Sequence, residues 1–201
     1  MLYNYFFYNC TMKKIIILLF SLPVFVFGQL GDYYKSNGHS KAKGLEFQIK
    51  TPLGFEQMEA DRPNIVQKWV KNKNDNSKLV MFMVLVRNLP EEMRGFGKSD
   101  WRQYLKYESG IDDFTEDLGE VAENVKYYVL DNYPGIYYDG FMEMDRLDQT
   151  FKLYHKTVQV FTSKHIFVIQ MSVNNKILLK TNEYLFNSLA NSVIITDQYG
   201  N

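Results

Sequence analysis

The sequence contains few of the residues on which most enzyme chemistry depends. Its 201 residues include one cysteine, Cys10, and three histidines. Because Cys10 lies upstream of an expected cleavage point, we expect a processed chain without a disulfide, a thiolate nucleophile or a cysteine-based metal site. The HExxH and Gly-x-Ser-x-Gly motifs do not occur, and position 92, where a Walker motif needs its first glycine, is Glu92. We therefore expect no catalytic residue, no metal and no cofactor.

The chain also lacks an excess of charge of either sign. It carries 23 Lys and Arg against 23 Asp and Glu, so its formal net charge is zero. Nucleic-acid binding leaves a basic electrostatic signature that is missing here, so we expect no nucleic-acid partner. Hydrophobic residues make up 46% of the chain and aromatics 16%, which is enough for a core and excludes wholesale disorder.

A third feature that the chain lacks is an apolar run long enough to cross a membrane. The run from Ile15 to Phe27 is shorter than the roughly 18–20 residues that a span needs. It follows Met12-Lys13-Lys14 and is followed by the small residue Gly28 before Gln29, an arrangement typical of a secretory signal peptide. We predict a signal peptide over 1–28 with Met12 as the true start; a membrane anchor is the alternative. The mature chain would begin at Gln29 without a stable membrane span and would be periplasmic or secreted.

Residues 29–43 are polar and rich in Gly, Ser and Lys, which predicts a flexible leader before a single domain over 44–197. Apolar residues alternate at Leu45, Phe47 and Ile49, the period of a half-buried strand. Strands are also expected over 65–71 and 78–87, and the second is apolar at nearly every position. A helix is expected from an N-cap at Ser99 to Tyr107.

The last third of the chain predicts two hairpins, a helix and a short strand. The first hairpin joins 125–131 to 136–147 through a turn at 132–135, and the second joins 150–161 to 165–173. Both faces of the second hairpin are apolar, so both should be covered. We therefore predict an α+β fold, a three-layer α/β/α sandwich around a mainly antiparallel sheet. His155 and His165 lie too far apart in that hairpin to share a metal.

The order of these segments resembles a known family. The strand LEFQI is followed by the turn Pro52-Leu53-Gly54-Phe55, and the hairpin HKTVQVFTSKHIFVIQMSV precedes a helix and the segment NSVII. This order resembles the PsbP/Mog-type sandwich, including DcrB-like exported bacterial proteins, over roughly residues 44–196. Phe55 stands where such turns often have Trp. The resemblance implies an α/β/α sandwich and a binding or scaffolding role.

Two segments are candidates for partner binding. Loop 88–97 carries Arg94 and Phe96, with a glycine on either side of Phe96, and we expect both side chains to be exposed. Loops on a rigid scaffold often mediate recognition. Residues 108–123 contain acids and no base, and we take Asp112, Asp113, Glu116 and Asp117 as possible contacts for a basic partner. The alternative is that both segments are solvated connections.

These observations favour an exported, non-catalytic binding or assembly module of the cell envelope, with an envelope or secreted protein as its partner. The alternative is a carrier of a small apolar ligand, which would need an apolar cavity of about 300 Å³ or more between sheet and helices. A hydrolase ranks third, because it would need convergent titratable groups in a cleft.

Overall fold

The computed structural model describes residues 29–60, 62–107, 121–146 and 149–196. In chain order the elements are β1 (Leu30–Lys35), the 3₁₀ turn η1 (Ser40–Ala42), β2 (Phe47–Pro52), β3 (Glu56–Met58), β4 (Ile65–Lys71), η2 (Asn76–Lys78), β5 (Val80–Asn88), η3 (Glu91–Met93), α2 (Lys98–Tyr104), β6 (Val121–Leu130), β7 (Tyr133–Arg146), β8 (Gln149–Phe161), β9 (His165–Val173), α4 (Lys176–Thr181), α5 (Glu183–Ala190) and β10 (Ile194–Ile195).

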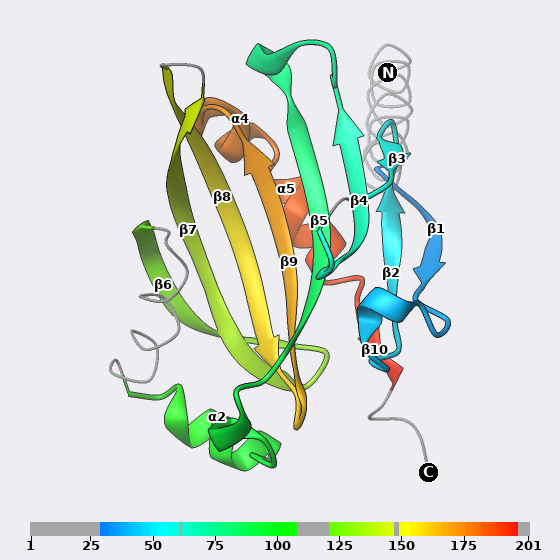
Figure 1. The fold of residues 1–201 in the computed structure, drawn as a ribbon, viewed down its shortest axis with the longest axis vertical. Coiled ribbons are helices and arrows are strands. Elements are labelled where there is room, and N and C mark those ends of the chain that lie inside the picture. Colours follow the sequence, from blue (N-terminus) through cyan, green and yellow to red (C-terminus); the bar gives the residue numbers. More distant parts are fainter. Residues whose placement is uncertain (1–28, 61, 108–120, 147–148, 197–201) are drawn as a thin grey trace, which may run out of the picture.

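Within these residues the strands form two sheets, which lie side by side in Figure 1. The large sheet has seven strands in the order β3-β4-β5-β9-β8-β7-β6, and the small sheet has three in the order β1-β2-β10. The neighbouring strands pair antiparallel in both sheets. The predicted α+β class with a mainly antiparallel sheet is confirmed. No helix in the described part of the chain has the length and apolarity to cross a bilayer.

The expected flexible leader over 29–43 is wrong for much of its length. Strand β1 pairs antiparallel with β2, with Tyr34 opposite Ile49. The buried Ser36 hydroxyl accepts a hydrogen bond from the Phe47 amide at 3.0 Å, and Ala42 is only 1% exposed. The segment is polar overall because β1 is an edge strand with one exposed face.

The β6–β7 hairpin turns earlier than the sequence predicted. Its turn residues are Asp131 and Asn132, both with positive φ (45° and 64°), as in the two-residue turns that match strand twist. The expected turn at 132–135 is therefore wrong, and Pro134 pairs with Val129 inside the hairpin. Gly135 is required by close packing, because a Cβ there would lie 2.1 Å from the Gln159 carbonyl oxygen.

The β8–β9 hairpin turns at Ser163 and Lys164, since the Thr162 amide donates a hydrogen bond to the His165 carbonyl at 2.9 Å. The register places Val158 opposite Ile169 and His155 opposite Ser172. Side chains therefore alternate between two faces in the way that the sequence predicted.

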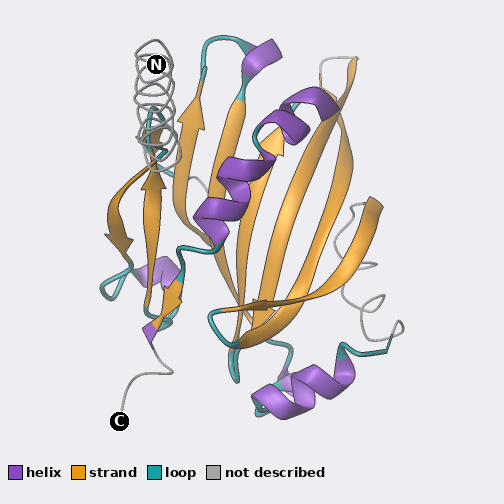
Figure 2. Cartoon of the chain, turned by 180° about the vertical axis from the view of Figure 1, so that it is seen from behind, coloured by secondary structure: helices purple, strands orange, loops and turns teal. Residues whose placement is uncertain are grey.

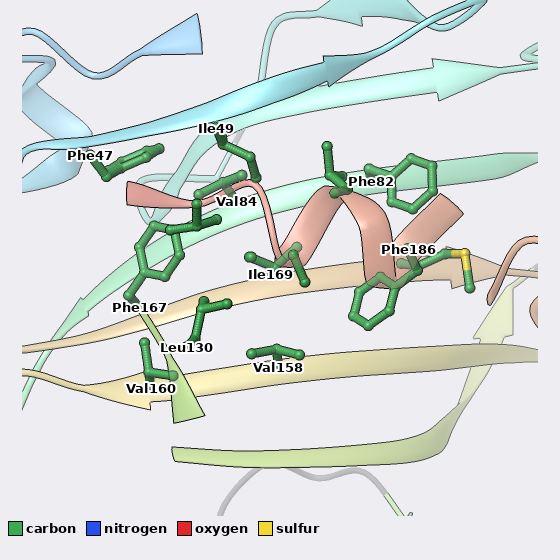
Figure 3. Close-up of a cluster of buried hydrophobic side chains, with 14 of the residues drawn as sticks. Phe47, Ile49, Phe82, Val84, Leu130, Val158, Val160, Phe167, Ile169 and Phe186 are labelled. Carbon is green, nitrogen blue, oxygen red and sulfur yellow. The ribbon is translucent and has the colours of Figure 1, made fainter. Parts of the chain in front are cut away.

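One face of the large sheet packs against α4, α5 and the small sheet. Figure 2 shows the two helices running diagonally across this face. The core between these layers is aliphatic and aromatic, and Figure 3 shows Val84, Ile169 and Phe186 pointing into it. All three are 0% exposed, as expected for a strand over 78–87 that is apolar at nearly every position and a hairpin with two covered faces.

The opposite face packs against α2 at the end of the sheet near the β8–β9 turn (Figure 1). Trp101 and Leu105 are buried against this face, and the Trp101 ring stacks on Phe161 with 4.5 Å between centroids. The N-cap of α2 is Gly97 rather than the expected Ser99. The Asp100 carboxylate accepts a hydrogen bond from the Gly97 amide at 2.7 Å, which fixes the helix start two residues earlier.

Candidate functional site

Two clefts of the described residues have a buried lysine or histidine in their lining, together with other side chains that can carry charge. The first, the Lys156 cleft, has a volume of about 310 Å³ and lies between the β6–β8 strands and helices α4 and α5. The second, the Arg94 cleft, has a volume of about 570 Å³ and lies between loop 88–97 and the β8–β9 turn. They differ in how their charges are compensated.

In the Lys156 cleft a buried ammonium group is surrounded by acceptors. Lys156 Nζ lies 2.6 Å from Asp139 Oδ1, 2.9 Å from the Tyr137 hydroxyl and 3.1 Å from Glu183 Oε1. Burial alone lowers the pKa of Lys156, but these hydrogen bonds outweigh it and the pKa is raised. The same ammonium lowers the pKa of Glu183. Lys156 therefore stays charged at neutral pH and is not a base or nucleophile.

The position and size of this cleft suit the apolar carrier considered from the sequence, but its lining does not. Phe141, Tyr154 and Leu179 supply apolar walls. The other lining residues are mostly charged: Glu123, Asp139, Lys156, Lys176, Lys180 and Glu183. An apolar ligand would have to desolvate these charges, so the cleft disfavours that function. Its network instead attaches α5 to the sheet through Glu183.

The Arg94 cleft is built by hydrogen bonds between two segments that are distant in sequence. The Leu89 amide donates to the Lys164 carbonyl at 2.9 Å, and the Gly95 amide donates to the Ser163 carbonyl at 3.1 Å. Gly95 has φ of +94°, a conformation that glycine adopts without strain. These bonds hold loop 88–97 against the turn of the β8–β9 hairpin, so the cleft has a fixed backbone frame.

Three side chains that can carry positive charge line this cleft, and none of the described residues that line it is acidic. The lining residues are Asn88, Arg94, Gly95, Ser163, Lys164 and His165. His165 is 9% exposed, and its Nε2 lies 3.1 Å from the Lys43 carbonyl oxygen. Because a carbonyl oxygen only accepts hydrogen bonds, this contact places the hydrogen on Nε2.

The Arg94 side chain is oriented by its own loop. Its Nε donates to the Leu89 carbonyl at 3.2 Å, and its Nη1 lies 3.4 Å from Glu91 Oε1. The Glu91 side chain is 87% exposed, so this ion pair is strongly screened by water. Glu91 therefore neutralises little of the charge that Arg94 presents.

Phe96 occupies a different environment from the one that the sequence suggested. We expected it to be exposed beside Arg94, but it is half-buried and packs on Trp101 with 5.1 Å between ring centroids. It also lines a smaller hollow of about 270 Å³, together with Tyr133 and Ser163. This aromatic hollow adjoins the Arg94 cleft, because Ser163 lines both.

The structure therefore places Arg94 and Phe96 in two different hollows that adjoin at Ser163. The acidic candidates Asp112, Asp113, Glu116 and Asp117 lie outside the described residues. Sequence reasoning did not select Lys164, which was assigned to a turn, and it considered His165 as a metal ligand rather than as part of a binding surface. Their role depends on the pairing of β5 with β9, which places Asn88 opposite His165. No local pattern in the sequence records that pairing.

A further titratable group, His155, is buried within the large sheet. It is 3% exposed, its Nδ1 lies 2.8 Å from the Ser172 hydroxyl, and its Nε2 has no hydrogen-bond partner. Burial lowers its pKa to about 4, so the imidazole is neutral at neutral pH. Within the described ranges, no three His, Cys, Asp or Glu side chains gather as metal ligands would.

No protein-family model matches the sequence, and no curated protein matches it. Three similar solved structures come from distant organisms. CyanoP, the cyanobacterial PsbP of Synechocystis, is 11% identical with a TM-score of 0.47, over 84% of this chain and 94% of its own. The Ran-binding protein Mog1p of Saccharomyces cerevisiae is 10% identical with a TM-score of 0.46, over 84% and 97%. LpqN of Mycobacterium tuberculosis, involved in cell envelope biogenesis, is 14% identical with a TM-score of 0.46, over 74% and 82%.

These structures include a PsbP and a Mog protein, the two proteins for which the sandwich that the sequence resembles is named. Identities this low concern the fold alone and carry no information about partners or activity. The DcrB-like assignment and the export of the chain stay predictions.

Proposed function

We propose that this protein is an exported, non-catalytic binding module of the cell envelope, and that its contact surface is the end of the large sheet around the Arg94 cleft. The observation that carries the proposal is this cleft of about 570 Å³, whose positively charged lining is held on a rigid backbone frame. Binding sites commonly consist of loops fixed to a stable scaffold. The export part of the proposal is based on the signal peptide predicted from the sequence of residues 12–28.

The charged groups of the Lys156 cleft support the non-catalytic part of the proposal. A general base or nucleophile needs a pKa near the working pH and access to a substrate. Lys156 has its pKa raised and is held by three acceptors, whereas His155 has its pKa lowered and is buried. Both groups therefore have fixed protonation states at neutral pH.

The proposal is tested by capturing the partner with variants of the surface. Tagged full-length protein is expressed in its own cells and purified from the envelope fraction, where its sequence should begin at Gln29 by mass spectrometry. A partner recovered with the wild type should be lost with the double variant Arg94→Ala, Lys164→Ala.

The matched control is Arg102→Ala, Lys106→Ala, which removes the same residue types from α2 and the residues after it, outside the cleft. The control should recover the partner as the wild type does. Recovery that is equal in all three proteins would exclude this surface as the interface.

A further inference from the structure

We propose that the Arg94 cleft binds a carboxylate group that projects from an acidic segment of a partner protein. This inference rests on the proposed binding function and specifies its chemistry. It follows from the weakly compensated cations in the cleft, from the orientation of Arg94 and from the aromatic hollow beside it.

The cations of the cleft keep donors available for a ligand. Within the described part of the chain, Arg94 Nη2 and Lys164 Nζ have no hydrogen-bond partner. In the Lys156 cleft, by contrast, the buried ammonium contacts two carboxylates and a phenol. An anion entering the Arg94 cleft would meet positive charge without displacing an internal acid from its lining.

The geometry of Arg94 favours a planar oxyanion. The guanidinium group presents its donors in a fixed fork that matches a carboxylate. Its bond from Nε to the Leu89 carbonyl already restricts the side chain, so less rotamer freedom remains to be lost when a ligand binds. Lys164 is exposed on the opposite wall and adds a second, more mobile charge.

The volume of the cleft and its neighbour favour a protein segment as the source of the carboxylate. A cleft of about 570 Å³ is larger than a single small anion requires. The aromatic hollow continues from it through Ser163 and is lined by Phe96 and Tyr133. A segment with an acidic residue next to an apolar one would place a side chain in each hollow.

The proposal is tested by NMR titration of the ¹⁵N-labelled full chain. The probe is an acetylated and amidated peptide with the sequence Gly-Asp-Leu-Asp-Gly, and the control peptide has Asn in place of both Asp residues. The acidic peptide should shift the backbone amide signals of Gly95, Ser163 and Lys164. The control peptide should bind at least about tenfold more weakly, because it loses charge-assisted hydrogen bonds.

Two charge-matched double variants separate a defined site from general attraction. Arg94→Gln, Lys164→Gln should weaken binding of the acidic peptide at least about tenfold, whereas Arg102→Gln, Lys106→Gln should change it less than about twofold. Equal weakening by both pairs would overturn the proposal, as would the absence of shifts at the three amides. Inorganic phosphate that binds more tightly than the peptide and displaces it would also overturn it, since the ligand would then be a phosphate.

The titration and the partner capture fail independently. If the acidic peptide binds in the cleft but the Arg94, Lys164 variant still captures the native partner, the carboxylate site stands and the proposed docking function is wrong. If capture is lost but the peptide does not bind at the cleft, the docking surface stands and the carboxylate chemistry is wrong.

Discussion

The middle of β8 and the turn beyond its C-terminal end differ in how their charged side chains are paired. In the middle, Lys156 is enclosed by Asp139, Tyr137 and Glu183, and the neighbouring His155 is held neutral on the other face of the sheet. Beyond the end of the strand, Lys164 faces a cleft whose described lining contains no acid. Compensation in the Lys156 cleft stabilises the fold, whereas the weakly compensated charge of the Arg94 cleft is, in our proposal, available to a partner. A net charge of zero for the whole chain hides this difference.

The largest loss of stability is expected on removal of Lys156, whose buried charge is compensated by two carboxylates. Replacing Lys156 by Met leaves Asp139 and Glu183 without their shared cation, and we expect the free energy of unfolding to fall by about 2–4 kcal/mol. The estimate stays below that for a fully buried pair because the two carboxylate side chains are 26% and 44% exposed. Urea denaturation measures the change.

Lys152→Met is the matched control, since Lys152 lies on the same strand and pairs with Glu143 at 2.8 Å, but both side chains are about half exposed. It should leave the denaturation midpoint unchanged. If both variants lost the same stability, burial would not distinguish the two ion pairs and the contrast between the regions would fail.

A second test uses pH to examine the neutral group in the middle of β8. The unfolded chain protonates His155 below its ordinary pKa of 6.5, but in the folded chain burial lowers that pKa to about 4. Between these two values a falling pH favours the unfolded chain. The free energy of unfolding should fall by about 2 kcal/mol between about pH 7.5 and about pH 5.

His155→Gln should remove this part of the pH dependence, and the exposed His39→Gln should retain it. The slope of stability against pH is the quantity compared, so a uniform loss of stability in the variant does not affect the test. An unchanged slope in His155→Gln would show that the imidazole is not held neutral by the sheet.

The fold was largely predictable because its strands carry local patterns. Strand β4 has the bounds that were predicted, and the alternation of β8 and β9 assigned their side chains to the correct faces. Strand β1 was missed because its two core contacts, Leu30 and Tyr34, are separated by a glycine, an aspartate and an exposed tyrosine. Single-face burial on an edge strand leaves a weak signal.

Only one side of the Arg94 cleft, the loop 88–97, could be predicted as a candidate site from the sequence. Arg94 could be selected because a long loop with flanking glycines is visible in the sequence. Lys164 and His165 could not be selected from the sequence. They lie near loop 88–97 only because β5 pairs with β9, and these two strands are distant in sequence. Similarly, β7 and β8 bring Asp139 opposite Lys156, and nothing local indicates that this pair is buried.

The smallest difference in stability is expected between variants of Phe96 and Arg94, which the sequence analysis placed together in an exposed loop. Phe96 packs on Trp101 and Tyr104 with centroid distances of 5.1 and 6.4 Å, so Phe96→Ala should lower the free energy of unfolding by about 1–2 kcal/mol, less than for a fully buried Phe. Arg94→Gln should change it by less than about 0.5 kcal/mol, because its Glu91 partner is exposed. Urea denaturation of both variants measures the difference, and Phe96→Leu should recover part of the loss. Equal stability of Phe96→Ala and the wild type, together with weaker binding of the acidic peptide, would assign Phe96 to the contact surface instead of the core.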